Sequence, residues 1–434
     1  MRARAYSWGR YPRSPQALAR VHDRQAGLPD FEGSALPYGN GRSYGDSCQN
    51  PGATLLDCRG LDRFIAFDPA SGRLHCEAGV TLDEIIALAL PQGWFLPVTP
   101  GTRHVTVGGA IGNDVHGKNH HVAGSFGHHV RSFELLRSDG ERRLCGPGDA
   151  DGWFGATVGG LGLTGLVTRA ELQLRRVPGS SLEVENIRFC NLADFFALSR
   201  ESCESHEYSV AWIDCLAHGR SLGRGHFTRA NHAVQPLDER PAAPRRQWAM
   251  PLTPPVSLVN RLTLRPFNSF YYWRQLPLRR RHASHLLPFF YPLDGIGQWN
   301  RMYGPAGFLQ YQCVLPPQAA ADGIPALLQE IARSGQGSFL AVLKQFGTRP
   351  SPGMLSFPRP GTTLALDFPN TGESLLALLL RLDQIVDAAG GAQYPAKDAR
   401  MTATSFQQSY PRWQDFSRFI DPRFSSGFWR RVTE

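Results

Sequence analysis

Residues 100–121 read PGTRHVTVGGAIGNDVHGKNHH, and this stretch decides which fold the chain adopts. Two other segments rich in glycine accompany it, PYGNGRSYGD at residues 37–46 and ATVGGLGLTGLV at residues 156–167. In residues 37–46, closely spaced glycines allow successive backbone N–H groups to point at one anion, as in a phosphate-binding nest. Each segment alone is more typical of an ordinary turn, but together they favour a site for a phosphorylated ligand.

The third segment contains the pattern G-x-G-x-x-G at Gly160, Gly162 and Gly165, which is the dinucleotide fingerprint of a Rossmann unit. In that unit the pattern opens a helix. Residues 166–174 instead alternate apolar and polar side chains and predict a strand. We therefore exclude a nicotinamide cofactor at this segment.

The composition is that of a globular, turn-rich protein with a basic balance. Of 434 residues, 42% are apolar, and 45 glycines and 33 prolines favour loops. The net charge of +9 favours an anionic partner such as phosphate, nucleic acid or a lipid surface. Among 46 basic residues, lysine occurs only at Lys118, Lys344 and Lys397. In a chain this rich in arginine, a lysine reflects either chance or the need for a compact, titratable ammonium group.

Cysteine and histidine patterns give no support for a metal site, so we expect none. The eight cysteines include no C-x-x-C pair, which excludes a zinc ribbon and favours free thiols in a reducing compartment. His116 and His120 are four residues apart, but nearby glycines argue against the helix that would align them on a metal. No apolar run approaches the roughly 20 residues that span a bilayer. We expect a protein that is cytoplasmic or peripheral to the cytoplasmic membrane.

Strands dominate the predicted secondary structure. A helix is predicted over residues 82–90, entered through Thr81 with Glu84 in a capping box. After residue 178, strand-like runs alternate with helices at residues 192–200, 319–334 and 373–389, which indicates an α+β fold with a second, antiparallel sheet. Residues 231–255 lack periodicity and are interpreted as a long excursion.

Residues 264–281 hold five arginines and five aromatic side chains without an acid. This composition favours contact with an anionic membrane surface, and the alternative is a buried strand with outward arginines.

The three glycine segments, together with EAGVTLDEI at residues 77–85 and YPAKDAR at residues 394–400, resemble the vanillyl-alcohol-oxidase-type (PCMH-type) FAD-binding flavoproteins. The similarity continues through YPLDGIGQWNRMYG, GFLQYQCVLP, SFLAVLKQFG, LSFPRPG and LDFP, and therefore covers most of the chain. It implies a two-domain FAD-binding fold with an antiparallel-sheet substrate domain. The implied division is an FAD-binding domain at residues 1–178, a substrate-binding domain at 179–390, and a C-terminal segment at 391–434 that returns to the first.

The resemblance also implies which residues bind FAD. Many relatives attach the flavin covalently through a histidine in the first glycine loop, and Arg42 occupies that place here, so we expect non-covalent FAD. The implied cofactor-binding residues are Gly39, Asn40, Gly41, Arg42, Ser43, Tyr44, Gly45, Gly101, Thr106, Val107, Gly108, Gly109, Asn113, Asp114, Val115, His116, Val167 and Tyr394.

The implied reaction is oxidation of the 2′-hydroxyl of a polyprenyl-phosphoryl-β-D-ribose to the 2′-keto sugar. Lys397 lies beside the flavin in this family, and the implied catalytic residues are Lys397, His116, Tyr44 and Lys118. His116 and Lys397 remain alternative bases for the hydroxyl proton. The implied substrate-binding residues are Lys118, Gln310, Gln312, Lys344 and Ala365; some relatives carry a cysteine where this chain has Ala365.

A separate NAD(P)H-dependent reductase is the implied partner, because the keto sugar must be reduced to complete epimerisation to the arabinose form. Two alternatives remain. An alditol or sugar-1,4-lactone oxidase using O2 would share the fold, although such enzymes usually keep the histidine that is Arg42 here. A basic nucleic-acid-binding protein would leave the three glycine segments unexplained.

Overall fold

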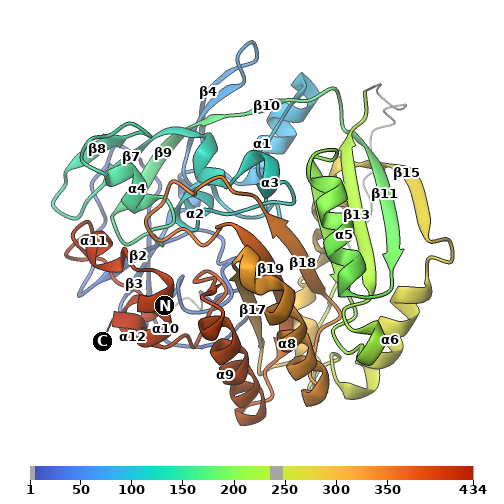
Figure 1. Cartoon of the computed structure of the whole chain (residues 1–434). Helices are drawn as coiled ribbons and strands as arrows, with labels where there is room; N and C mark the ends of the chain where they lie inside the picture. The colour runs from blue at the N-terminus through green and yellow to red at the C-terminus, as the bar shows by residue number, and fades with distance from the viewer. Residues whose placement is uncertain (1–4, 235–247, 434) are drawn as a thin grey trace.

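The computed structural model describes residues 5–234 and 248–433, which form an α+β fold built on two antiparallel sheets (Figure 1). The smaller of the two has the strand order β4-β5-β9-β7-β8. Its strands are β4 (Phe64–Asp68), β5 (Arg73–Glu77), β9 (Leu166–Gln173), β7 (Val130–Leu136) and β8 (Arg142–Cys145). A parallel three-stranded sheet precedes it, formed by β1 (Ala17–Arg20), β3 (Thr54–Asp57) and β2 (Ala35–Tyr38).

Strand β9 begins at Leu166, directly after the last glycine of the third segment, and confirms that these glycines open no helix. The helix predicted after Thr81 is α1 (Leu82–Ala89), and its capping box is present, because Glu84 N–H donates to Thr81 Oγ1 at 3.3 Å. Helix α2 (Val107–Gly112) lies within the second glycine segment, and Thr106 is its N-cap. Both helices pack their apolar side chains into the core beneath the five-stranded sheet.

The larger sheet has the order β15-β11-β13-β12-β18-β19-β17-β20 and is antiparallel throughout. Its strands are β11 (Ser181–Phe189), β12 (Tyr208–Ile213), β13 (Gly225–His232), β15 (Arg279–His285), β17 (Phe308–Leu315), β18 (Ala341–Phe346), β19 (Gly361–Pro369) and β20 (Ala392–Gln393). This is the antiparallel sheet that the sequence predicted for the second half.

Three helices cover the outer face of this sheet: α5 (Leu192–Cys203), α8 (Pro317–Ser334) and α9 (Glu373–Ala388) (Figure 1). In α9, Leu375, Leu378, Leu379 and Leu382 follow the helical period and are fully buried. Each buried leucine contributes about 1.5–3 kcal/mol relative to exposure. The inner face is left free to face the glycine segments.

Residues 264–281 do not form the buried strand that was one of the two interpretations. They include most of helix α6 (Arg261–Trp273) and the start of edge strand β15. The buried-strand interpretation is therefore wrong, because only Leu264, Asn268 and Tyr272 of the helix are buried. Of the excursion predicted at residues 231–255, residues 235–247 lie outside the described part of the chain. Residues 248–249 form the short strand β14 (Trp248–Ala249), which pairs with β16 (Ile296–Gly297).

The chain ends in three helices, α10 (Ala403–Ser409), α11 (Trp413–Ser417) and α12 (Gly427–Thr433), which pack against the first glycine segment and the three-stranded sheet. The domain boundaries at residues 178 and 390 stay a prediction. Within residues 5–234 and 248–433, no helix has the length and apolar character needed to cross a membrane.

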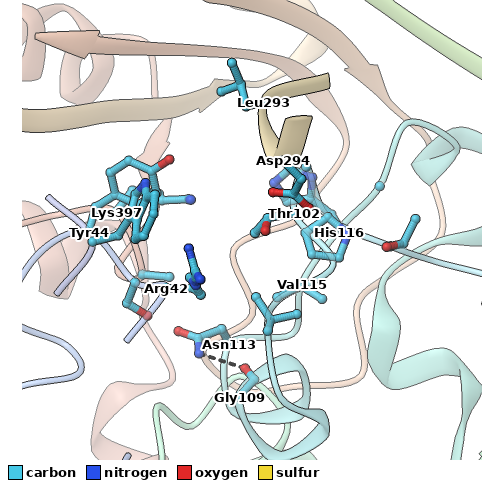
Figure 2. A pocket seen from close by; sticks show the side chains of 18 of the residues that line it. Arg42, Tyr44, Thr102, Gly109, Asn113, Val115, His116, Leu293, Asp294 and Lys397 are labelled. Carbon is cyan, nitrogen blue, oxygen red and sulfur yellow. Dashed lines mark hydrogen bonds between the residues drawn. The ribbon is translucent and has the colours of Figure 1, made fainter. Parts of the chain in front are cut away.

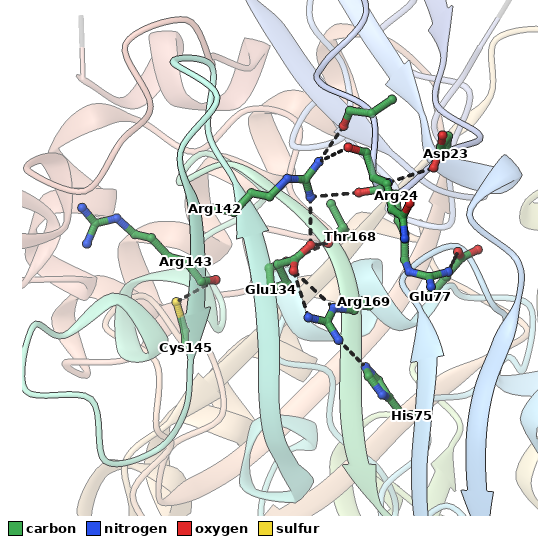
Figure 3. A network of polar contacts seen from close by, with 12 residues as sticks. Asp23, Arg24, His75, Glu77, Glu134, Arg142, Arg143, Cys145, Thr168 and Arg169 are labelled. Atoms are coloured by element: carbon green, nitrogen blue, oxygen red, sulfur yellow. Dashed lines mark hydrogen bonds and ion pairs between the residues drawn. The ribbon is translucent and has the colours of Figure 1, made fainter.

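A polar network joins the N-terminal segment to the five-stranded sheet (Figure 3). Glu134 accepts hydrogen bonds from Arg142 at 2.9 Å and from Arg169 at 3.0 Å. Arg24 forms an ion pair with the buried Glu77 at 2.8 Å. These contacts hold the N-terminal segment against the sheet.

Candidate active site

A cavity of about 560 Å³ lies between the inner face of the eight-stranded sheet and the three glycine segments. Its floor comes from the glycine segments, and its roof comes from β17, β18 and β19 of the large sheet. Side chains from the segment after β20 and from residues 288–294 close the sides. Figure 2 shows Arg42, Lys397 and Tyr44 on one side of this space and Asp294 and His116 on the other.

Most of the residues that the resemblance implied line this cavity. They are Gly39, Asn40, Gly41, Arg42, Ser43, Tyr44, Gly101, Thr106, Gly108, Gly109, Asn113, Val115, His116, Lys118, Val167, Gln310, Gln312, Lys344, Ala365, Tyr394 and Lys397. The other three, Gly45, Val107 and Asp114, lie behind the wall. Asp114 is buried and accepts hydrogen bonds from Gly127 N–H and Ser356 Oγ, so it shapes the second glycine segment from within.

Glycine is required where the first glycine segment turns. Gly41 has φ of +57°, a left-handed conformation that side chains disfavour. A Cβ at Gly45 would collide with the carbonyl oxygen of Asp398. These two positions bring the first glycine segment against the segment that carries Lys397, although the two are about 350 residues apart in the chain.

Asn113 is held at the base of the cavity by two backbone contacts. Its Nδ2 donates to the carbonyl oxygen of Gly109 at 2.8 Å (Figure 2). Its own carbonyl oxygen accepts from Tyr394 Oη at 2.8 Å. Tyr394 therefore acts as a wall that joins the second glycine segment to the C-terminal part of the chain.

The residues present fit an anionic dinucleotide such as the FAD that the resemblance implied. Arg42 stacks on the ring of Trp8, 4.1 Å from guanidinium carbon to ring centroid. Its Nε is buried and has no hydrogen-bond partner among the described residues. An unpaired buried donor is costly, so this arrangement is typical of a site that receives an anion. An arginine side chain cannot form the covalent bond to flavin that a histidine ring can form, so non-covalent FAD stays the prediction.

Both ring nitrogens of His116 lie within hydrogen-bond distance of a polar side chain. Its Nε2 lies 3.0 Å from Gln312 Nε2, and its Nδ1 lies 3.1 Å from Lys344 Nζ. Burial and the nearby Lys344 hold the pKa of His116 well below its usual value, so the ring is neutral. These contacts favour Lys397 over His116 as the base.

Lys118 and Lys344 are buried cations on the sheet side of the cavity. Lys118 Nζ donates to the carbonyl oxygens of Phe289 and Phe290 at 3.0 and 2.9 Å. Burial lowers the pKa of each lysine to about 7. A buried ammonium without an acid beside it gains most from a bound anion. These two lysines are therefore suited to the phosphate of a substrate.

Lys397 differs from the other two lysines because a buried acid, Asp367, lies near it. Sequence reasoning missed Asp367. Gln310 donates to Asp367 Oδ1 at 2.5 Å, so the amide that was expected to face a sugar donates to this acid instead. The only sequence signal was its position two residues after Ala365 on one strand, which places both on the same face.

Trp212, Tyr271 and Arg274 also line the cavity, at its end near α6, although none of them was expected at the site. Within the described residues, no group of histidine, cysteine, aspartate and glutamate is placed to hold a metal ion. The expected absence of a metal stays a prediction.

The sequence matches the family model described as FAD binding domain over residues 24–146. The decaprenylphosphoryl-β-D-ribose oxidase of Mycolicibacterium smegmatis is 39% identical over 96% of this chain and 93% of that protein. An uncharacterised protein of Streptomyces coelicolor is 37% identical over 81% of this chain and 100% of its own length. The alditol oxidase of a Streptomyces species is 24% identical over 88% of this chain and 86% of that protein.

Proposed function

Since the chain belongs to the decaprenylphosphoryl-β-D-ribose oxidase family of FAD-dependent oxidoreductases, we propose that it oxidises the 2′-hydroxyl of a polyprenyl-phosphoryl-β-D-ribose to the 2′-keto sugar. The cavity is the observation that supports a polyprenyl-phosphoryl ribose as the substrate. It combines two buried lysines without an acid beside them, Lys118 and Lys344, with an end near α6 that the exposed Arg274 lines.

Bound FAD supplies an acceptor for the two electrons of the sugar C–H bond. Arg42 and the first glycine segment hold the cofactor's diphosphate, while Asn113, Val115 and Tyr394 shape the wall beside its ring system. Lys118 and Lys344 bind the substrate phosphate, and Gln312 and Ala365 line the sugar site. The remaining requirement is a base for the hydroxyl proton.

The product implies a partner. A 2′-keto sugar must be reduced to give the arabinose form, and a separate NAD(P)H-dependent reductase is the class of enzyme that consumes it. We propose that this enzyme is cytoplasmic or peripheral to the cytoplasmic membrane, because a substrate with a long apolar tail and an anionic head is met at a membrane surface.

The surface formed by α6 and β15 suits such contact, and we call it the α6–β15 surface. Its exposed apolar side chains are Leu262, Phe270, Trp273, Leu276 and Leu278, and its exposed cations are Arg265, Arg274, Arg279, Arg280 and Arg281. Tyr271, Arg274 and His282 belong to the same surface and line the cavity. A lipid-linked sugar therefore has a short path from a bilayer to the site.

The proposed function is tested by mixing the oxidised holoenzyme anaerobically with a short-chain polyprenyl-phosphoryl ribose. We expect loss of the oxidised flavin absorbance and a product lighter by two hydrogens. An alditol such as xylitol is the matched comparison. Rapid flavin reduction by the alditol, with none by the ribose phosphate, would instead support the alditol oxidase alternative.

A further inference from the structure

Asp367 is a buried acid for which the proposed function has no role. Its side chain is 1% exposed. Oδ1 accepts from Gln310, but Oδ2 is buried and has no hydrogen-bond partner among the described residues. A buried carboxylate oxygen left unpaired is destabilising, because nothing compensates for its lost hydration. Such an oxygen is stabilised by a proton.

The fold places this acid directly behind the cavity wall. In the pairing of β17 with β19, Asp367 lies opposite Gln310, and Ala365 lies opposite Gln312. Because Ala365 lines the cavity, Asp367 points to the same side of the sheet. Gln310 and Lys397 form the wall in front of it.

Three titratable groups from other elements face Asp367: Tyr44 from the first glycine segment, Tyr303 from the turn before β17, and Lys397. Burial raises the pKa of both tyrosines well above its usual value, so both remain neutral phenols. Lys397 is therefore the only one of the three that exchanges a proton near neutral pH.

The two groups act on each other. Burial raises the pKa of Asp367 to about 7, and the charge of Lys397 opposes this rise. Burial lowers the pKa of Lys397 to about 8, and the charge of Asp367 opposes this fall. Groups coupled in this way titrate as a pair, and near neutrality the pair holds about one proton.

We propose that Lys397 and Asp367 form a proton-holding pair in which Lys397 is the base for the substrate hydroxyl and Asp367 is the positioning residue that stores the lysine's own proton. This inference rests on the proposed oxidation of an alcohol and adds the destination of its proton. It also explains how one lysine serves first as a neutral base and afterwards as a cation.

The hydroxyl proton and the electrons of the substrate go to different acceptors. At rest the single proton of the pair is mainly on Lys397, whose pKa is the higher of the two. When that proton moves to Asp367 Oδ2, Lys397 Nζ becomes a neutral amine. The O–H bond of the substrate breaks, its proton forms an N–H bond at Nζ, and the carbonyl forms as the C–H bond gives its hydrogen and both electrons to oxidised FAD. The pair then holds two protons and one positive charge. This charge appears only when the cofactor has been reduced, so it favours the reduced state selectively.

The direct test is a reduced-minus-oxidised infrared difference spectrum of the holoenzyme near pH 8, with dithionite as the reductant so that no substrate is needed. We expect the wild type to gain the carbonyl band of a protonated carboxylic acid, and Asp367→Asn to lack that band. Asp214→Asn is the matched control, because Asp214 is also buried but pairs with Arg224 at 2.8 Å. The inference is wrong if the wild type gains no band or if Asp367→Asn keeps it.

A second test uses the pH dependence of flavin reduction by the ribose substrate. For the wild type, the rate of flavin reduction plotted against pH should be bell-shaped. The rate falls at low pH because the pair is fully protonated and accepts no further proton, and it falls at high pH because the pair has lost its proton and carries a negative charge. Asp367→Asn should lose the alkaline limb, since it has no carboxylate to leave a negative charge. Gln310→Leu should move the acid limb to higher pH. The hydrogen bond from Gln310 lowers the pKa of Asp367, so its removal raises that pKa. A bell unchanged in both variants would overturn the inference. If the substrate fails to reduce wild-type FAD, the proposed function is wrong. The infrared test, which needs no substrate, still shows whether Lys397 and Asp367 form a proton-holding pair.

Discussion

The ammonium nitrogen of Lys397 lies 3.9 Å from the centroid of the Tyr44 ring. The contact is reinforced by the backbone, because Tyr44 N–H donates to the carbonyl oxygen of Ala396 at 2.9 Å. A cation over an aromatic face in a desolvated site gains roughly 2 kcal/mol. The contact thus fixes the ammonium of Lys397 at the cavity wall and couples the first glycine segment to the C-terminal return of the chain.

Substitution of Lys397 tests this arrangement. Lys397→Ala should lower the rate of flavin reduction by substrate roughly 10²-fold or more, the order seen when one preorganised donor is removed. Lys397→Arg should fail as well, because a planar guanidinium neither fits the same cavity nor becomes a neutral base. Stopped-flow absorbance of the bound flavin measures both rates. Near-normal reduction in Lys397→Ala would contradict a catalytic role.

Arg431 provides a separate prediction about positioning. Its Nη2 lies 2.7 Å from Asp46 and 2.9 Å from Asp398, so one guanidinium joins the two segments that carry Tyr44 and Lys397. Arg431→Met leaves two buried acids without their partner and should lower the free energy of unfolding by roughly 3 kcal/mol. Thermal melts with and without added FAD measure the loss. Asp46→Asn combined with Arg431→Met should recover part of it, and no recovery would show that the pairing itself is unimportant.

The mode of cofactor attachment is tested by precipitation. Because the resemblance implies that Arg42 replaces a flavin-linking histidine, acid should release all of the FAD into the supernatant. The absorption spectra of supernatant and pellet decide the outcome. Yellow colour that stays with the acid-precipitated protein would show a covalent bond at another residue.

The sequence predicted the parts of the site that local motifs specify. Glycine spacing predicted an anion site in the first segment, and the resemblance, which the second segment and the string YPAKDAR help to carry, implied that the second segment lines the cofactor and that Lys397 lies beside it. Helical periodicity predicted α9 because Leu375, Leu378 and Leu382 recur at the helical spacing. In each case the signal lies within one short segment.

The sequence did not predict contacts that depend on pairing between distant segments. Asp367 has no motif, and its role follows from the register that sets it opposite Gln310. The helix α6 was missed because Pro266 and a run of aromatic residues reduce the helical signal, while packing of Leu264 and Tyr272 decides the outcome. The occupied nitrogens of His116 likewise depend on β17 and β18, each about 200 residues away along the chain.

Buried histidines predict how stability depends on pH. Burial lowers the pKa of His129 to about 4, while the unfolded chain titrates near 6.5. Between these values the unfolded state binds more protons, so the free energy of unfolding should fall as the pH drops from about 6.5 to 4. His129→Gln keeps a donor toward the carbonyl oxygen of Ala123, which His129 Nε2 contacts at 2.9 Å, and removes this titration. Urea unfolding across this range should therefore show a shallower slope in the variant, and an equal slope would contradict the assignment.

The last prediction concerns the α6–β15 surface and its contact with an anionic bilayer. Arg279 and Arg281 lie 4.0 and 3.0 Å from Glu185, so the apolar side chains give the cleaner variant. Leu262, Phe270 and Leu276 are 86%, 71% and 76% exposed, and replacing all three by serine removes surface that gains from burial among lipid tails. We expect vesicles containing anionic lipid to bind this variant at least about 10-fold more weakly, since each 1.4 kcal/mol corresponds to tenfold. The matched control is Leu144→Ser, because Leu144 is 74% exposed on β8 and lies outside this surface.

The same variant separates membrane contact from catalysis. If the α6–β15 surface delivers the lipid-linked sugar to the cavity, the triple serine variant should raise KM for a long-chain substrate in vesicles and leave kcat and a short-chain analogue unchanged. Replacing Arg279, Arg280 and Arg281 by glutamine should weaken vesicle binding at low salt, because each cation near an anionic surface contributes about 1 kcal/mol. Salt should abolish this second effect and spare the first, since screening acts on charges and not on apolar burial. Equal binding by the parent, the serine variant and the glutamine variant would show that the surface meets no membrane and that the substrate reaches the cavity by another route.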